Sequence, residues 1–322
     1  MRRLSLLLLK AAVSILLLYL SLRSVNLAVV GASLSRFHPG WIALALLVLT
    51  LQVGLMAIRW SEIAAICDAR LPLPQATQIS FIASFFNQVL PSSVGGDAAR
   101  IWILARRDGD WANATYSVLI DRIVGVLVLA LIVIACLPWS MELIQDPLAR
   151  AVLLLIGAGS VGAAAVFLAI GIWDWPLLGR FMPTRHLVAA ARKAWRLCRT
   201  GQAMTTVTAC SVAIHLLTVT SAWCCMKAVA APVGFAPVLF LLPPVLLITT
   251  IPISIAGWGV RETSMVVAFS YAGLAQSDGL TLSILFGAVS FALGIIGGAV
   301  WIVSGLKMQS FAPPHEAVAD NP

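Results

Sequence analysis

Six stretches of this chain are each long and apolar enough to cross a lipid bilayer as a helix. They cover about residues 4–22, 41–64, 116–138, 149–172, 205–227 and 280–306. A helix needs roughly 20 apolar residues to cross the hydrocarbon core. Of the 322 residues, 61% are hydrophobic and only 11% are charged, which is more apolar surface than a soluble domain can bury. The chain is therefore predicted to be an all-α polytopic membrane protein.

A single integral membrane domain is predicted to fill residues 1–322, because no polar segment is long enough to form a second core. The run at about 4–22 follows two arginines, as in a signal peptide, but it is long and lacks a clean small-residue cleavage site. We interpret it as a retained first span, with a cleaved signal as the alternative. Residues 308–322 form a short polar tail.

Two further apolar regions, about 76–104 and 237–272, each contain the same short pattern near their middles. Residues 91–100 read PSSVGGDAAR and residues 252–261 read PISIAGWGVR. Both fit Pro-x-Ser-(Val/Ile)-(Gly/Ala)-Gly-x-x-x-Arg. Helix breakers and an arginine are costly inside a membrane. Two broken helices at corresponding places are typical of the binding site of a transporter.

The basic residues predict how these segments are oriented, because cytoplasmic loops are rich in Lys and Arg. Arg2, Arg3 and Lys10 place the N-terminus inside. Positive charge at both ends of 76–104 predicts a re-entrant hairpin that enters and leaves on the cytoplasmic side. Counting the later spans places both ends of 237–272 outside and the C-terminus inside.

The two halves of the chain, about 1–140 and 145–307, then match each other in opposite orientations. Each half has two spans, a hairpin that carries the motif, and one more span, which is an inverted-topology repeat. Two full crossings in each motif region would give the same end positions, so that alternative stays open.

The first copy of the motif combines groups that suit an anionic head group. Ser93 can cap a new helix after the proline, and the free amides of a helix N-terminus attract phosphate. Gly95 and Gly96 let the backbone come close to a ligand or to another helix. Asp97 and Arg100 share one face of the helix, and an arginine can grip a phosphate with two hydrogen bonds.

The second copy repeats this logic with one difference. Three prolines are expected to interrupt its apolar run: Pro243, Pro244 and Pro252. Arg261 stands where Arg100 stands, whereas Trp258 replaces Asp97, so the copies are not chemically equivalent. The predicted substrate-binding residues of both copies are Asn87, Ser93, Gly95, Gly96, Asp97, Arg100, Ser254, Gly257, Arg261 and Glu262. The structural alternative is that Gly and Pro serve packing and that the charged residues only satisfy each other.

Secondary candidates lie at the edges of two spans. Arg59 and Glu62 are three residues apart and are expected to pair with each other. Asp121 and Arg122 are expected to contact the first hairpin. No pattern of a catalytic residue, a metal site or a cofactor site is found, because the six cysteines form no CxxC pair and the four histidines are scattered.

The net charge of +8 does not point to nucleic acid, because the basic residues lie between spans. The densest run, from Arg180 to Arg199, is interpreted as a cytoplasmic loop, with an anionic-lipid surface patch as a secondary role.

Three stretches resemble the lysylphosphatidylglycerol synthetase/flippase transmembrane family. Residues 86–100 (FNQVLPSSVGGDAAR) and 252–262 (PISIAGWGVRE) are similar to its two signatures, and Asp121-Arg122 followed by Gly125 also fits. The resemblance implies a lipid flippase-like membrane domain. Relatives are linked to aminoacylated phosphatidylglycerol, and another branch to hopanoid biosynthesis. Bifunctional members carry an aminoacyltransferase domain after the membrane part, for which the chain leaves no room, so synthesis is not expected.

The expected function is a lipid flippase or transporter of a bacterial-type inner membrane, with both termini cytoplasmic. Its substrate would be a polar-headed lipid: an anionic or aminoacylated phospholipid, or a hopanoid-type lipid. One alternative is an intramembrane lipid-modifying enzyme that uses Asp97, Asp121 and Glu262 for acid–base chemistry. Another is a non-transporting partner of a lipid-synthesis enzyme. The expected partners are membrane lipids and such an enzyme, and no nucleic acid.

Overall fold

The computed structural model describes residues 37–90, 94–173, 182–251 and 257–305, and within these ranges all regular structure is helical. The helices are α3 (Pro39–Ile66), α4 (Leu73–Val89), α5 (Gly95–Asp108), α6 (Trp111–Leu143), α7 (Pro147–Ile172), α8 (Met182–Arg199), α9 (Gly201–Ala228), α10 (Phe235–Thr249), α11 (Val260–Tyr271) and α12 (Gln276–Val303). The predicted span at 4–22 and the candidates Ser93 and Ser254 lie outside the described residues.

Five of the described helices, α3, α6, α7, α9 and α12, are long and apolar enough to cross a membrane. Four of them cover a predicted segment and extend it by a few residues at one end or both. Helix α12 begins four residues before the predicted segment 280–306 and ends three residues before its end, at Val303. These segments hold almost no helix-breaking residues and few charges, so a helix that satisfies its own backbone is the stable form in hydrocarbon. The prediction of an all-α membrane protein is confirmed.

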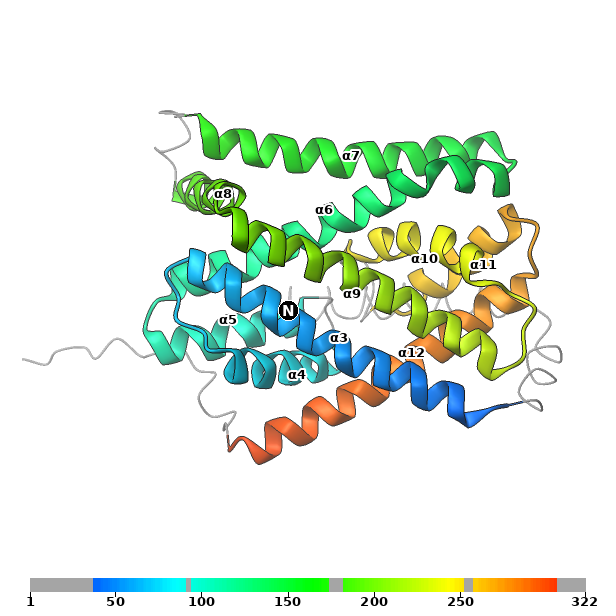
Figure 1. Ribbon diagram of the computed structural model, residues 1–322, viewed down its shortest axis with the longest axis horizontal. Helices are drawn as coiled ribbons and strands as arrows, with labels where there is room; N and C mark the ends of the chain where they lie inside the picture. The colour runs from blue at the N-terminus through cyan, green and yellow to red at the C-terminus, as the bar shows by residue number, and fades with distance from the viewer. Residues whose placement is uncertain (1–36, 91–93, 174–181, 252–256, 306–322) are drawn as a thin grey trace, which may run out of the picture.

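The long helices run side by side, and the short helices lie near the two ends of the bundle (Figure 1). Helices α4 and α5 pack on each other toward the end where α3 finishes, whereas α10 and α11 pack on each other toward the opposite end. Across the bundle, α3 packs on α9, α4 on α12, and α10 on α6. The largest buried apolar cluster lies among α3, α6, α7, α9, α10, α11 and α12.

A glycine on α12 sets the distance between α12 and α4. A Cβ atom at Gly297 would overlap the carbonyl oxygen of Phe81 on α4. Small residues allow this kind of close backbone contact between membrane helices. We expect Gly297→Ala to lower the free energy of unfolding by about 1–3 kcal/mol, because the helices must move apart.

The matched control for this substitution is Gly54→Ala, since Gly54 lies in α3 and has open space at its Cβ position. Thermal unfolding in detergent can be followed with a thiol-reactive dye, because Cys67, Cys224 and Cys225 are buried until the chain unfolds. Equal melting temperatures for the two variants would contradict the close contact.

Helix α10 corrects the expectation that three prolines interrupt the second motif region. Pro243 and Pro244 lie inside the continuous helix, and both are buried. Prolines are tolerated in membrane helices where neighbouring helices and hydroxyl side chains compensate for the lost backbone bond. The hydroxyls of Thr249 and Thr250, at the end of the helix, donate to the carbonyls of Leu246 and Leu247. The third proline, Pro252, lies outside the described residues.

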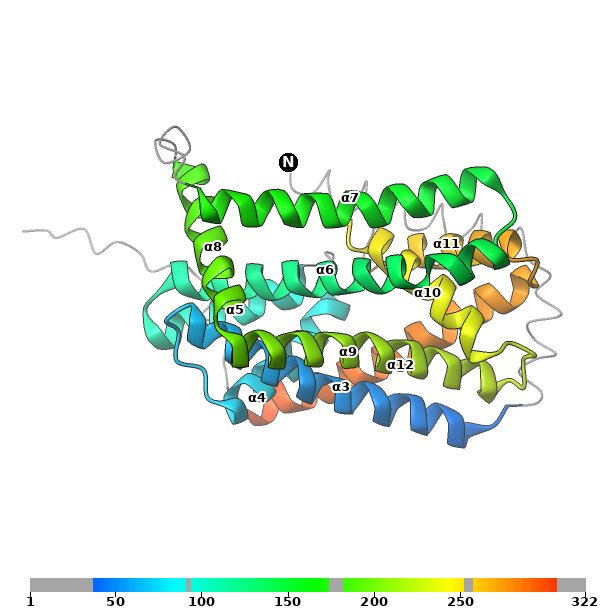
Figure 2. The ribbon, with the colours of Figure 1, turned by 45° about the horizontal axis from the view of Figure 1, so that its top comes forward.

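Helix α8 corrects the interpretation of the basic run as a loop. It is an amphipathic helix that lies across the ends of α7 and α9 (Figure 2). Asp68, in the turn after α3, accepts hydrogen bonds from Lys193 and Arg196 of α8 at 2.7 and 2.9 Å. These hydrogen bonds, from Lys193 first, hold the pKa of Asp68 below its ordinary value. Helix α8 therefore contacts the turn after α3 as well as α7 and α9.

Candidate functional site

The break between α4 and α5 is stabilised by contacts between the two helices. Asn87 of α4 accepts a hydrogen bond from the backbone amide of Gly96 at 2.8 Å and so takes one of the free amides of α5. A Cβ atom at Gly95 would lie 2.6 Å from the carbonyl oxygen of Phe86, and one at Gly96 would lie 2.5 Å from that of Ala83. The glycines therefore serve the approach of another helix, which is one of the two roles that the sequence left open.

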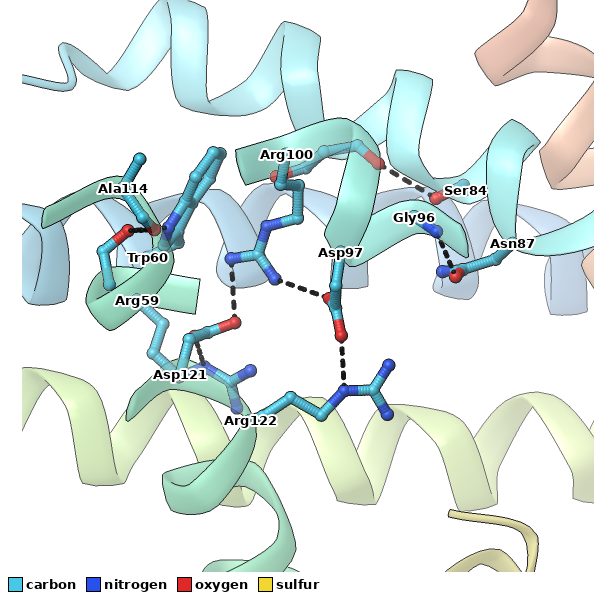
Figure 3. Close-up of polar contacts among 12 residues, drawn as sticks. Arg59, Trp60, Ser84, Asn87, Gly96, Asp97, Arg100, Ala114, Asp121 and Arg122 are labelled. Carbon is cyan, nitrogen blue, oxygen red and sulfur yellow. Dashed lines mark hydrogen bonds and ion pairs between the residues drawn. The ribbon is translucent and has the colours of Figure 1, made fainter. Parts of the chain in front are cut away.

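Five charged residues on three helices form one connected group, which we call the charged cluster: Arg59 of α3, Asp97 and Arg100 of α5, and Asp121 and Arg122 of α6 (Figure 3). Asp121 accepts from Arg59 at 2.7 Å and from Arg100 at 2.8 Å. Asp97 lies 2.6 Å from Arg122 and 3.5 Å from Arg100. The two aspartates therefore join three helices through shared arginines.

The charged cluster is buried, except at Arg122. Side-chain exposure is 3% for Asp121 and 7% for Arg100, but 35% for Arg122. Charges in such a place are stable only when they are paired and hydrogen-bonded. The expected contact of Asp121 and Arg122 with the first hairpin region is confirmed.

Neighbouring side chains complete the surroundings of two of these arginines. Arg59 donates to Ser211 of α9 at 3.2 Å, and the guanidinium of Arg100 lies 4.1 Å from the ring centre of Trp60. Such a cation–π contact is stronger when water is excluded. The expected pairing of Arg59 with Glu62 is wrong, because the Arg59 side chain turns to Asp121 of α6 instead.

Within the charged cluster, three arginines stand against two aspartates, which leaves one formal positive charge. The Nε atom of Arg100 is buried and has no hydrogen-bond partner. An excess cation in a low-dielectric site attracts an anion more strongly than it would in water. The arrangement is therefore suited to a single anionic group.

A cavity of about 880 Å³ borders the charged cluster. Its walls come from α5, α6, α7 and the end of α10, and they are mostly apolar. Asp97 and Arg122 are the charged residues in its lining, and Thr115, Ser160 and Thr250 add hydroxyl groups. Ligand sites commonly combine apolar walls with a few polar groups in this way.

The second copy of the motif forms a different and electrically neutral group. Glu262 accepts from Arg261 at 2.8 Å, from Ser283 at 2.9 Å and from the amide of Gly259 at 2.6 Å. Arg261 also donates to Ser283 and faces the ring of Trp258 at 5.1 Å. Arg261 is 8% exposed and Glu262 is fully buried. The structural alternative, in which the charges satisfy each other, describes this copy well.

The structure thus separates the predicted binding residues into two groups. Asp97, Arg100 and the secondary candidates come together in the charged cluster beside the cavity, whereas Arg261 and Glu262 pair at α11 and α12. Gly257 adopts a positive φ of 79° in the turn before α11, where glycine is favoured.

Sequence reasoning missed several residues of these sites: Trp60, Ser211, Ser283, and the α7 residues Gly159 and Ser160 that line the cavity. The position of Trp60 directly after Arg59 was the available signal for the first of them. The others lie on separate helices, and no local pattern connects them to the motifs.

A family model described as the lysylphosphatidylglycerol synthase TM region matches residues 7–298, which is nearly the whole chain. The matched part contains both copies of the motif and every helix of the charged cluster. No curated protein is significantly similar to the chain.

Proposed function

Because this chain belongs to the family of the lysylphosphatidylglycerol synthase TM region, we propose that it is a flippase that binds a polar-headed lipid and moves it across the membrane. The observation that carries the proposal is the apolar cavity with the positively charged cluster at its side. A lipid needs both features, since its chains require apolar walls and its phosphate requires a cation.

Arg122 is the residue that we assign to the head group. It is the most exposed arginine of the charged cluster and it lines the cavity. Arg100 and Arg59 are more deeply buried, and both are paired with Asp121. Together with Arg122 they give the charged cluster its excess positive charge. The single excess charge suits a phosphate, so an anionic or aminoacylated phospholipid, or a hopanoid-type lipid with an anionic head, is the proposed substrate class.

The packing of the helices supports an inverted repeat as the basis of movement. In such a repeat, α3, α4, α5 and α6 of the first half correspond in order to α9, α10, α11 and α12 of the second half. The contact of α4 with α12 then has its counterpart in the contact of α10 with α6, and both contacts are present. The short helix pairs α4–α5 and α10–α11 lie toward opposite ends of the bundle (Figure 1). We propose that both pairs are re-entrant hairpins and that the two halves rock against each other, as in other transporters with inverted repeats.

The distribution of charge supports one orientation in a bacterial-type inner membrane. The end of the bundle with α8 holds Arg70, Arg106, Arg107, Arg185, Arg192, Lys193, Arg196 and Arg199, against Asp68, Asp108 and Asp110. The opposite end holds Glu142, Asp146, Arg150, Lys227 and Asp278. Cytoplasmic segments are rich in basic residues, so we propose that the α8 end and both termini face the cytoplasm.

The proposal predicts that filling the cavity stops lipid movement. Gly159 lines the cavity and has open space at its Cβ position, so Gly159→Trp can project its ring into the cavity without displacing a helix. We expect the rate of lipid flipping to fall by about tenfold or more, since a blocked path raises the barrier by at least about 1.4 kcal/mol. The assay is dithionite bleaching of fluorescent phosphatidylglycerol, its lysyl ester and phosphatidylcholine in proteoliposomes.

The matched control is Gly162→Trp. Gly162 lies on the same helix and also has open space at its Cβ position, but the cavity lining does not include it. This variant should flip lipid at the wild-type rate. Equal activity of the two variants would show that the cavity is not the path, and wild-type vesicles that flip none of the lipids faster than protein-free vesicles would refute transport itself.

A further inference from the structure

The outer face of α8 carries a stripe of arginines that the proposed transport does not use. Five of its 18 residues are basic and none is acidic. Arg185, Arg192, Arg196 and Arg199 are exposed, and they follow one another at spacings of seven, four and three residues. At about 100° per residue these spacings place all four on one side of the helix.

The opposite face of α8 fixes the helix to the bundle. Val188, Ala191, Ala194 and Leu197 are buried, and α8 shares an apolar cluster with α3, α6, α7 and α9. A Cβ atom at Gly171, near the end of α7, would overlap the carbonyl oxygen of Ala191. The arginine stripe is therefore held in a constant direction, away from the bundle.

The direction of α8 places this stripe at the membrane surface. The spanning helices run side by side, and α8 lies across their ends (Figure 2). A helix that crosses the ends of spanning helices lies in the plane of the interface, where lipid head groups are. Its partly buried Trp195 is of the residue type that is enriched at membrane interfaces.

The nearby acidic charge does not neutralise the stripe. Asp68 accepts from Lys193 and Arg196, whereas α8 itself holds five basic residues and no acidic one. Even after Asp68 is counted, the helix retains a large positive charge. Anionic head groups attract such basic surface helices through screened Coulomb forces.

We propose that the arginine stripe of α8 is a binding surface for anionic phospholipid head groups of the leaflet on its side of the membrane. The surface depends only on the membrane location of the protein, so it stands or falls separately from lipid flipping. A surface of this kind would keep anionic lipid close to α7 and α6, whose side chains line the cavity.

The test uses the full chain in a neutral detergent, with phosphatidylserine as the anionic probe and phosphatidylcholine as its uncharged counterpart. Thermal unfolding is followed with a thiol-reactive dye. Phosphatidylserine should raise the melting temperature at lower concentrations than phosphatidylcholine does. The combined substitution of Arg185→Gln, Arg192→Gln and Arg199→Gln should raise the required phosphatidylserine concentration about a hundredfold, at about fivefold for each arginine.

Three controls make the result specific. Lysine at the same three positions keeps the charge and should keep the response, whereas Lys227→Gln, at the opposite end of the bundle and against the ring of Trp223, should leave the response unchanged. For wild-type protein, the response should weaken between low salt and about 1 M salt, where the Debye length falls to about 3 Å. If the glutamine variant does not fold, this salt dependence of the wild-type protein still tests the proposal. A wild-type response in the glutamine variant, or one that salt does not change, would overturn the proposal. No response to phosphatidylserine would do the same and would favour an acidic protein as the partner of the stripe.

Discussion

Replacing Asp121 with alanine should destabilise the protein by about 3–5 kcal/mol. The carboxylate is buried and holds two arginines, Arg59 and Arg100, at 2.7 and 2.8 Å. Without it, two guanidinium groups on α3 and α5 would remain buried side by side with no counter-charge on α6. Removing one partner of a buried ion pair lowers the stability by more than the intact pair contributes to it, because the remaining charge stays buried without a partner.

The chain offers a control with the same kind of partners and a different environment. Asp68 also binds two basic side chains, Lys193 and Arg196, but its side chain is 55% exposed. Surface ion pairs contribute about 1 kcal/mol or less. Asp68→Asn removes the charge and tolerates the positive φ of 64° at this position, so it should change the stability little. Thermal unfolding of both variants with a thiol-reactive dye gives the comparison. Similar losses of stability would mean that the charged cluster is solvated and that its burial does not matter.

The sequence was sufficient to predict the long helices and the break between α4 and α5. Uninterrupted apolar runs leave a membrane-spanning segment little choice other than a helix, so the five described spans appear where they were predicted. The first break also appears where Pro91 and the two glycines indicated, since α4 ends at Val89 and α5 begins at Gly95. These features depend on neighbours in the sequence.

The parts that could not be predicted depend on contacts between distant segments. Arg59 could pair with Glu62 by spacing alone, but Asp121 of α6 is its partner at 2.7 Å. The amides expected to bind phosphate are partly used, because Gly96 donates to Asn87. The basic run on α8 looked like a loop because its positive charges dominate its composition, whereas its buried alanines and leucine make it a helix that packs on four others. The spacing of residues within one helix does not show which residue of another helix will be their partner.

Contacts between distant segments also change the prediction for the second copy of the motif. From the sequence alone, Arg261 and Arg100 were equivalent candidates for a lipid phosphate. In the structure, the charge of Arg261 is already neutralised by Glu262, and Ser283 joins the two. We therefore propose that Arg261 stabilises the contact between α11 and α12, and that the charged cluster of the first copy binds the head group alone.

Replacing Glu262 with alanine should consequently cost about 3–5 kcal/mol of stability, because Arg261 would be left buried and unpaired. Glu262 also accepts from the amide of Gly259, which would lose its partner at the start of α11. The measurement is the melting temperature in detergent, with the Glu262→Gln variant alongside, since glutamine can keep the hydrogen bond to the Gly259 amide and should recover part of the loss.

The double variant Arg261→Met/Glu262→Leu then separates structure from transport. Replacing both members of a buried pair with apolar side chains of similar volume is often nearly neutral, so this variant should be more stable than Glu262→Ala. If Arg261 only stabilises the helix contact, the double variant should still flip lipid in proteoliposomes, whereas Arg122→Gln should not. A folded double variant that no longer moves lipid would assign Arg261 to the path of the head group and restore the equivalence of the two copies.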